Sequence, residues 1–264
     1  MILVLRNNRL QEMGRARRAN AMIINEVQAK SILSASKVYP WVVNPYTGCQ
    51  HGCTFCYARF MKRFSGHREP WGQFVDVKVN APELLQAEIG RKKPGRVWVS
   101  GVCDPYQPIE GRYRITRRCL EILLANGWPV SVQTRSPLVL RDLDLLRDCG
   151  NLEVGCSIAT ADDAIRMLFE PNAPPIAERV NALEELHRAG VRTYAMIAPM
   201  LPGAEGLPAL LTGKIDRVIL DRMNYHYADW VYRKHDLEAC MTDAFFEQMQ
   251  QALEEAFAKQ GVRR

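Results

Sequence analysis

Strand-like and helix-like stretches alternate along this chain from Trp41 to its C-terminal end. The predicted strands are residues 42–43, 74–79, 96–100, 130–134, 152–158, 192–198 and 217–220. The predicted helices are residues 54–64, 82–89, 116–125, 138–149, 176–189 and 242–259, the last with Thr242 as its N-cap. This alternation is typical of parallel strands joined by crossover helices.

Six or seven βα units fit into 264 residues, a length at which α/β barrels commonly form one domain. The alternation by itself allows a partial barrel, a complete eight-stranded barrel or an open doubly wound sheet. In either barrel, the loops at the carboxyl ends of the strands would build the active site. We expect one such domain over residues 39–264, with a C-terminal helix, preceded by a polar, basic extension over residues 1–38.

A loop with three cysteines, spaced C-x3-C-x2-C, follows the first predicted strand and carries Cys49, Cys53 and Cys56. Three thiolates on one loop can converge on a soft metal centre such as an iron–sulfur cluster. A structural zinc site would want a fourth ligand. His51 is the local candidate, but it lies between two of the cysteines, where its ring would struggle to complete a tetrahedron. On a four-iron cluster, three cysteines would leave one iron free to bind a small molecule.

The stretch from Asn44 to Arg59, N-P-Y-T-G-C-Q-H-G-C-T-F-C-Y-A-R, resembles the cluster loop of the radical S-adenosylmethionine (SAM) enzymes, in particular the spore photoproduct lyase-like branch. The resemblance implies a partial (β/α)6 TIM-like barrel, a [4Fe-4S] cluster on the three cysteines, and SAM chelated by the free iron. In that superfamily the reduced cluster cleaves SAM to methionine and a 5′-deoxyadenosyl radical, which abstracts a hydrogen atom from the substrate. It also implies an electron donor of the flavodoxin or ferredoxin type.

The alternation of side chains along a strand predicts which residues face SAM. In the predicted strand 152–158, Ser157 lies on the face opposite the apolar residues and should point into the barrel, although neighbouring backbone could also satisfy its hydroxyl. By the same logic Gln133 and Arg135 share a face. Arg135 stands where the resembling proteins often carry a lysine near SAM, and an arginine could clamp the carboxylate of SAM.

The resemblance assigns two more residues to the cofactor. Tyr57, which follows the third cysteine, would pack against adenine, and Arg179, which follows Glu170-Pro171 at the family's spacing, would lie near the methionyl group. Each has a plainer alternative: a core tyrosine, a solvated helix position for Arg179 and a surface ion pair for Glu170.

The loop 103–110, C-D-P-Y-Q-P-I-E, resembles the D-x-Y-x-P-x-E loop of the same branch. Asp104 could bind the ammonium or ribose of SAM, and Cys103 or Tyr106 could face the substrate as catalytic groups. The alternative is a rigid proline-rich turn. Some spore photoproduct lyases carry a hydrogen-donating cysteine two residues before the position of Cys103, where this chain has Gly101, so Cys103 is the nearby replacement.

The formal charge of +6 is unevenly placed, because seven cations and two acids precede the cysteine loop. The cations are Arg6, Arg9, Arg15, Arg17, Arg18, Lys30 and Lys37. A basic arm of this kind can bind phosphates or can be a solvated terminus. The aromatic run 224–230 could stack a base, or could close the bottom of the barrel, which we favour.

Three functions fit the sequence. The first is radical SAM chemistry on a nucleic-acid base or nucleotide, and the second is the same chemistry on a peptide or small metabolite. The third is a non-catalytic, metal-bearing module that binds nucleic acid. No run of about 18 apolar residues and no export signal is present, and the five other cysteines are scattered like buried thiols. We therefore expect a cytoplasmic protein that does not cross a membrane.

Overall fold

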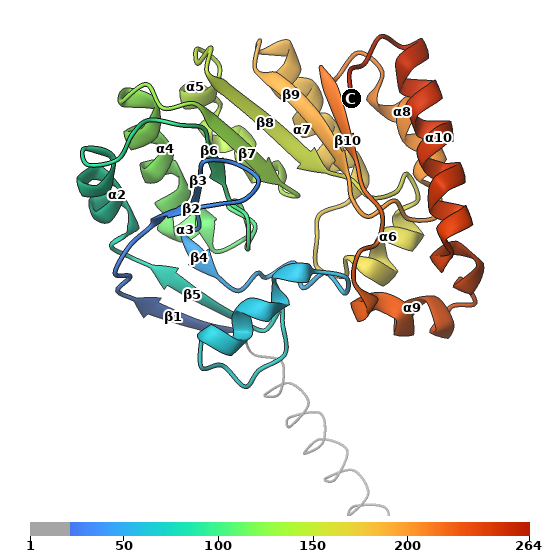
Figure 1. The fold of residues 1–264 in the computed structure, drawn as a ribbon, viewed down its shortest axis with the longest axis horizontal. Coiled ribbons are helices and arrows are strands. Elements are labelled where there is room, and N and C mark those ends of the chain that lie inside the picture. The colour runs from blue at the N-terminus through green and yellow to red at the C-terminus, as the bar shows by residue number, and fades with distance from the viewer. Residues whose placement is uncertain (1–21) are drawn as a thin grey trace, which may run out of the picture.

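The computed structural model describes residues 22–264, and one curved sheet organises them (Figure 1). Its seven strands lie in the order β10-β9-β8-β7-β6-β3-β2. All neighbours from β3 to β10 are parallel, and only the edge strand β2 runs antiparallel, against β3. The strands are β2 (Leu33–Ala35), β3 (Trp41–Val43), β6 (Val97–Val99), β7 (Val130–Thr134), β8 (Leu152–Ser157), β9 (Arg192–Ile197) and β10 (Arg217–Leu220). Six parallel strands in sequence order confirm the partial (β/α)6 barrel.

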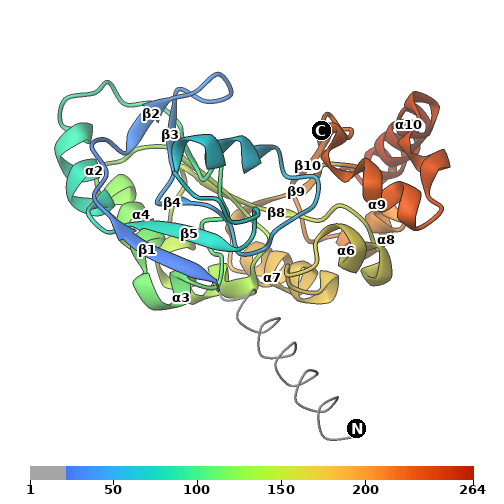
Figure 2. The same cartoon turned by 90° about the horizontal axis from the view of Figure 1, so that it is seen from below.

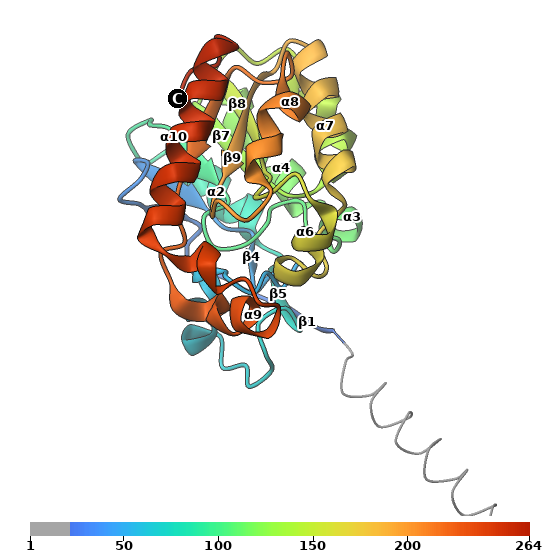
Figure 3. The same ribbon diagram turned by 90° about the vertical axis from the view of Figure 1, so that its right-hand side faces the viewer.

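Helices cover the outer face of this sheet, and Figure 3 shows the strands β7 to β9 between α10 on one side and α8 and α7 on the other. The α-helices are α2 (Ala81–Ile89), α3 (Glu110–Tyr113), α4 (Ile115–Ala125), α5 (Leu143–Leu146), α6 (Asp163–Phe169), α7 (Ile176–Arg188), α8 (Leu207–Leu211), α9 (Asp229–Lys234) and α10 (Asp243–Lys259). The predicted cap of α10 is confirmed, because Thr242 Oγ1 accepts a hydrogen bond from Phe245 N at 3.2 Å. Within residues 22–264, no helix combines the length and apolarity needed to cross a membrane.

A second sheet of three strands lies beside the open side of the barrel (Figure 2). In it β5 (Phe74–Lys78) pairs in parallel with β1 (Ile23–Val27) and antiparallel with β4 (Tyr46–Thr47). The predicted strand 74–79 therefore exists, but it is not a barrel strand as we expected. Its partner β1 comes from the predicted basic extension, which local periodicity does not connect to β5.

The extension itself contributes both β1 and β2 to the two sheets. Its five most N-terminal arginines, from Arg6 to Arg18, lie outside the described residues. The domain boundary at residue 38 stays a prediction.

Two predicted helices differ from the structure in kind. Of residues 54–64, only Tyr57–Phe64 are helical, as the 3-10 helix η1. The helix starts later than predicted because Thr54 is held in the loop by two hydrogen bonds to Phe169 O, at 2.8 and 3.1 Å. Residues 138–149 form the 3-10 helix η2 (Pro137–Asp142) followed by α5. The break lies at Asp142, whose buried carboxylate accepts hydrogen bonds from three side chains rather than facing solvent.

The inner face of the barrel is filled in layers along β8. Glu153 pairs with Arg217 at 3.1 Å at one end, and Ser157 faces the other end. Between them the ring of Tyr194, from β9, lies against Gly155, and its hydroxyl donates to Val132 O at 3.2 Å. Layers of side chains from neighbouring strands are the usual filling of such a barrel.

The substitution Gly155→Ala will destabilise the barrel. A Cβ at this position would lie 2.2 Å from the Tyr194 ring, and that ring is fully buried with no room to move aside. We expect the free energy of unfolding to fall by about 1–3 kcal/mol, measured by urea denaturation. Gly150→Ala is the matched control, because nothing lies within 4 Å of its Cβ. Equal stabilities for the two variants would contradict this packing.

Candidate active site

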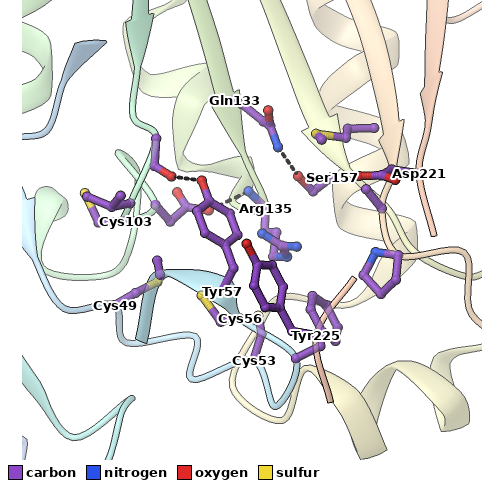
Figure 4. Close-up of a pocket in the computed structure, with 18 of the residues that line it drawn as sticks. Cys49, Cys53, Cys56, Tyr57, Cys103, Gln133, Arg135, Ser157, Asp221 and Tyr225 are labelled. Atoms are coloured by element: carbon purple, nitrogen blue, oxygen red, sulfur yellow. Dashed lines mark hydrogen bonds between the residues drawn. The ribbon is translucent and has the colours of Figure 1, made fainter. Parts of the chain in front are cut away.

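A cavity lies at the carboxyl ends of the parallel strands, closed on one side by the cysteine loop (Figure 4). Its empty volume is about 970 Å³, including the space at its open mouth. The loops after β3, β6 and β10 and the ends of β7, β8 and β9 all contribute side chains. This is the edge of the sheet at which the sequence predicts an active site.

The three cysteines of the C-x3-C-x2-C loop all line this cavity as free thiols. The loop is shaped by short backbone hydrogen bonds, Gly52 N to Cys49 O and Cys56 N to Cys53 O, both 3.2 Å. Gly48 precedes the loop with a φ of 90°, and a Cβ there would lie 2.3 Å from a backbone oxygen of β5. Only glycine fits that position, so the turn before the first cysteine is fixed by close packing.

Burial raises the pKa of each of the three thiols, to about 12 for Cys53, while the neighbouring Arg135 guanidinium pulls the pKa of Cys53 and Cys56 down. Buried thiols of this kind become thiolates when a cationic metal centre binds them. One cysteine binds each iron of an iron–sulfur cluster, so the thiols need to surround a common space rather than one point. Three free thiols around one cavity fit that requirement.

His51, the fourth ligand of the zinc alternative, is turned to another partner. Its ring is buried, with Nε2 3.3 Å from Asp104 Oδ2 and Nδ1 3.5 Å from Asn172 O. In the part of the chain that the structure describes, no three His, Cys, Asp or Glu side chains form a ligand set for a single ion. The mononuclear arrangement is therefore not formed by these residues.

Asp104 lines the cavity, but both of its carboxylate oxygens are in contact with other groups of the protein. Its carboxylate accepts hydrogen bonds from Thr134 Oγ1 at 2.6 Å and from Arg135 N at 2.7 Å, in addition to the contact with His51. Burial opposes its charge, yet these partners hold its pKa at about 2. Asp104 is therefore ionised and joins the 103–110 loop to β7, with little acceptor capacity left for a ligand.

Arg135 and Arg179 share one buried carboxylate. Glu170 accepts from Arg135 Nε at 2.8 Å and from Arg179 Nη1 at 2.6 Å, and Arg179 Nη1 also donates to Ser157 O at 3.0 Å. Arg135 faces the cavity, as predicted, whereas Arg179 is fully buried behind it and does not line it. The predicted direct contact of Arg179 with a cofactor does not match this position. The plainer alternatives, a surface ion pair and a solvated helix position, are also wrong, because both residues are buried.

Gln133 and Ser157 lie where strand alternation predicts. Both line the cavity, and Gln133 Nε2 donates to Ser157 Oγ at 3.0 Å, as Figure 4 shows. Met196 on β9 and Asp221 after β10 extend the same row along the cavity. These two residues were not predicted from the sequence, although Met196 shares a face with Tyr194 by the same period of two.

Cys103 and Tyr57 lie on the cavity wall opposite this row (Figure 4). The thiol of Cys103 lies 2.8 Å from Ser100 Oγ, and burial raises its pKa to about 11, so it carries its proton at neutral pH. The hydroxyl of Tyr57 donates to Gly101 O, and its ring is stacked on that of Tyr225.

Tyr106 differs from the prediction that it faces a substrate. It is fully buried, does not line the cavity, and donates its hydroxyl to Asp142 Oδ2 at 3.1 Å. Beside it the buried Glu110 accepts hydrogen bonds from Tyr46, Thr116 N and Arg141. The loop 103–110 is thus anchored in the core at its Tyr106 end and open to the cavity at its Cys103 end.

The aromatic run 224–230 does not close the barrel bottom, contrary to the reading that we favoured. Asn224 and Tyr225 line the mouth of the cavity, and Tyr225, Tyr227 and Trp230 are all exposed. The run follows β10, so it begins at the same edge of the sheet as the cysteine loop. Its position after the last parallel strand is the sequence signal that places it at this edge.

Comparisons with known proteins agree with this arrangement. The family model of the Radical SAM superfamily matches residues 43–205. An uncharacterised protein of Methanocaldococcus jannaschii is 35% identical over 181 residues, which are 68% of each chain. A radical SAM Nalpha-GlyT isomerase of Pseudomonas phage M6 is 27% identical over 164 residues, which are 61% of this chain and 33% of that protein. Further uncharacterised relatives are matched over 56% to 59% of their length.

Among solved structures, a spore photoproduct lyase complexed with dinucleoside spore photoproduct superposes with a TM-score of 0.67 at 15% identity. The superposition covers 89% of this chain and 79% of that one. At this identity the likeness shows a common fold.

Proposed function

This chain belongs to the radical SAM superfamily and is an enzyme of that class, and from this premise we propose that Cys49, Cys53 and Cys56 hold a [4Fe-4S] cluster beside bound SAM. When bound, the pair supplies a 5′-deoxyadenosyl radical that abstracts a hydrogen atom from a substrate. The observation that carries the proposal is the placement of three free thiols around one cavity at the carboxyl ends of the barrel strands.

The polar side chains of the cavity wall suit the groups of SAM. Arg135 is the partly buried cation beside the thiols, and its guanidinium can pair with the SAM carboxylate. Ser157 and Gln133 offer a hydroxyl and an amide for the ribose, and the ring of Tyr57 offers a face for adenine. Glu170 and Arg179 act behind this wall as positioning residues, because they fix the guanidinium of Arg135.

Cys103 is the candidate for returning a hydrogen atom to the substrate radical. Its thiol lines the cavity and keeps its proton, which a hydrogen-atom donor requires. Homolysis of the S–H bond would pass one proton and one electron to the substrate and leave a thiyl radical on Cys103. The analogous contact of Tyr106 is not part of this proposal, because its side chain points into the core.

A nucleic-acid base or nucleotide is the substrate class that we favour. The structural neighbour binds a dinucleoside photoproduct, and exposed aromatic rings surround the mouth of this chain's cavity. An electron donor of the flavodoxin or ferredoxin type completes the reaction. A peptide or small metabolite stays the alternative substrate, and weak salt dependence of substrate binding would favour it.

Anaerobic reconstitution with iron and sulfide tests this function. The reconstituted protein should become brown, and dithionite with SAM should release 5′-deoxyadenosine at a rate that depends on protein concentration. A colourless protein that leaves SAM intact would overturn the proposal.

Trp71 offers a test of the cluster environment that does not rely on turnover. Trp71 lines the cavity, and its buried indole N–H has no hydrogen-bond partner among the described residues, so it is available to donate to a cluster sulfur. Hydrogen bonds to cluster sulfurs raise the reduction potential. We expect Trp71→Phe to lower the midpoint potential, measured by redox titration followed by electron paramagnetic resonance. Trp128→Phe, in the core away from the cavity, should leave the potential unchanged.

A further inference from the structure

Basic and aromatic side chains alternate along η1, which leaves the cysteine loop and runs beside the cavity mouth. Its sequence is Y-A-R-F-M-K-R-F over residues 57–64, and it contains no acidic residue. Phe60 is 38% and Phe64 67% exposed, fractions that a core packing role does not explain. The guanidinium of Arg63 lies over both rings, 5.5 and 4.6 Å from their centroids.

A stack of rings connects this helix to the cavity. Tyr57 and Tyr225, which line the cavity, have near-parallel rings with centroids 6.3 Å apart, and Tyr225 and Tyr227 are parallel within 6° at 5.6 Å. The guanidinium of Arg59 caps the stack, 4.7 Å from the centroid of Tyr227. The rings of Tyr57 and Tyr225 appear side by side in Figure 4. The exposed surface is therefore continuous with the catalytic cavity.

The cations of this surface lack carboxylate partners. Many arginines of the chain form ion pairs, as Arg117 does with Asp144 at 2.7 Å. Among residues 22–264, by contrast, no carboxylate oxygen lies within 4 Å of a side-chain nitrogen of Arg59, Lys62 or Arg63. Lys62 Nζ donates to a backbone oxygen, Arg68 O, at 2.8 Å, and its charge is not neutralised. Unpaired positive charge beside exposed rings is complementary to phosphates beside exposed bases.

We propose that η1 and residues 225–227 form a binding surface for single-stranded nucleic acid, which guides an unpaired base to the cavity. This inference rests on the proposed function and specifies the substrate as a base in a single strand. Bases stack on aromatic side chains and phosphates contact the neighbouring cations in such sites. A duplex keeps its bases paired and stacked inside, so it cannot use the rings. The exposed rings also favour single-stranded nucleic acid over an acidic electron-donor protein, because positive charge alone would be enough to bind an acidic protein.

Fluorescence anisotropy of a labelled oligothymidylate of twelve nucleotides, titrated anaerobically with the reconstituted full chain, tests the proposal. We expect the single strand to bind more tightly than the same strand in a duplex with oligoadenylate. Phe64→Ala should weaken single-strand binding about tenfold through lost stacking. Arg63→Ala should weaken it and reduce its salt dependence between about 50 and about 200 mM.

Arg91→Ala is the matched control, since it removes an exposed arginine at the end of α2 and should leave binding unchanged. The basic N-terminal arm is present in every variant, so a loss in Phe64→Ala reports on this surface alone. Equal binding of single strand and duplex, or unchanged binding by both variants, would overturn the inference. So would a flavodoxin that binds this surface in an Arg63-dependent manner while the oligonucleotide does not.

The inference and the proposed function fail separately. Release of 5′-deoxyadenosine with dithionite needs no nucleic acid, so an active protein that does not bind the oligonucleotide contradicts only this inference. A protein that binds the oligonucleotide but never cleaves SAM contradicts the proposed function.

Discussion

Replacement of any one of Cys49, Cys53 and Cys56 by alanine will reduce iron binding and the release of 5′-deoxyadenosine to background. The three thiols line one cavity, and in the proposed site each holds one iron. With two thiolates left, two iron corners would lack a protein ligand and the cluster would not be retained. Iron content, visible absorption and 5′-deoxyadenosine release after anaerobic reconstitution measure the effect.

Cys149→Ala is the matched control for these three variants. Its thiol is also free and partly buried, but it lies at the end of the segment after α5 and donates to Leu145 O at 3.4 Å. This variant should load iron and cleave SAM like the unaltered chain. If Cys53→Ala kept its iron while Cys149→Ala lost it, the assignment of the cluster ligands would be wrong.

Local periodicity predicted those parts of the fold whose neighbours follow one another in sequence. The strand 130–134 matches β7 without error, and the faces of Gln133 and Ser157 follow from the alternation of side chains along a strand. The helix after Thr242 was found by its cap. These features depend on residues within a few positions of each other, so a short stretch of sequence is enough to predict them.

Contacts between distant segments could not be predicted in this way. β5 has the pattern of a barrel strand, yet it pairs with β1, about fifty residues earlier in the chain. Tyr106 and Arg179 belong to motifs that resemble a cofactor site, but burial decides their roles: each ends in a core network rather than in the cavity. A motif names residue types, whereas the depth of a side chain depends on what packs over it.

Glu170 contributes both to the stability of the fold and to the orientation of Arg135 in the site, and Glu170→Gln will impair both. Its carboxylate is buried and takes one hydrogen bond from Arg135 and one from Arg179. Burial disfavours its charge, but the two guanidiniums lower its pKa, so it is ionised. The neutral amide would leave the buried Arg179 and the partly buried Arg135 without this counter-charge. Removing one partner of a buried ion pair costs about 3–5 kcal/mol.

Urea denaturation of the cluster-free chain measures this loss in the free energy of unfolding without a contribution from iron. Asp144→Asn is the matched control: it removes a carboxylate that also pairs with an arginine, Arg117, but whose side chain is 61% exposed. Exposed pairs of this kind contribute about 0–1 kcal/mol. Equal losses in the two variants would contradict the burial of the Glu170 pair.

The same substitution should weaken SAM binding by the reconstituted protein, because Arg135 loses the carboxylate that holds its Nε on the cavity wall. Equilibrium dialysis with labelled SAM separates this effect from stability. It is done without urea, at a temperature at which both variants are folded. Asp144→Asn should bind SAM like the unaltered chain, since its partner Arg117 does not line the cavity. Unchanged SAM binding by a destabilised Glu170→Gln would mean that Arg135 keeps its orientation without Glu170, and that the buried carboxylate serves the fold alone.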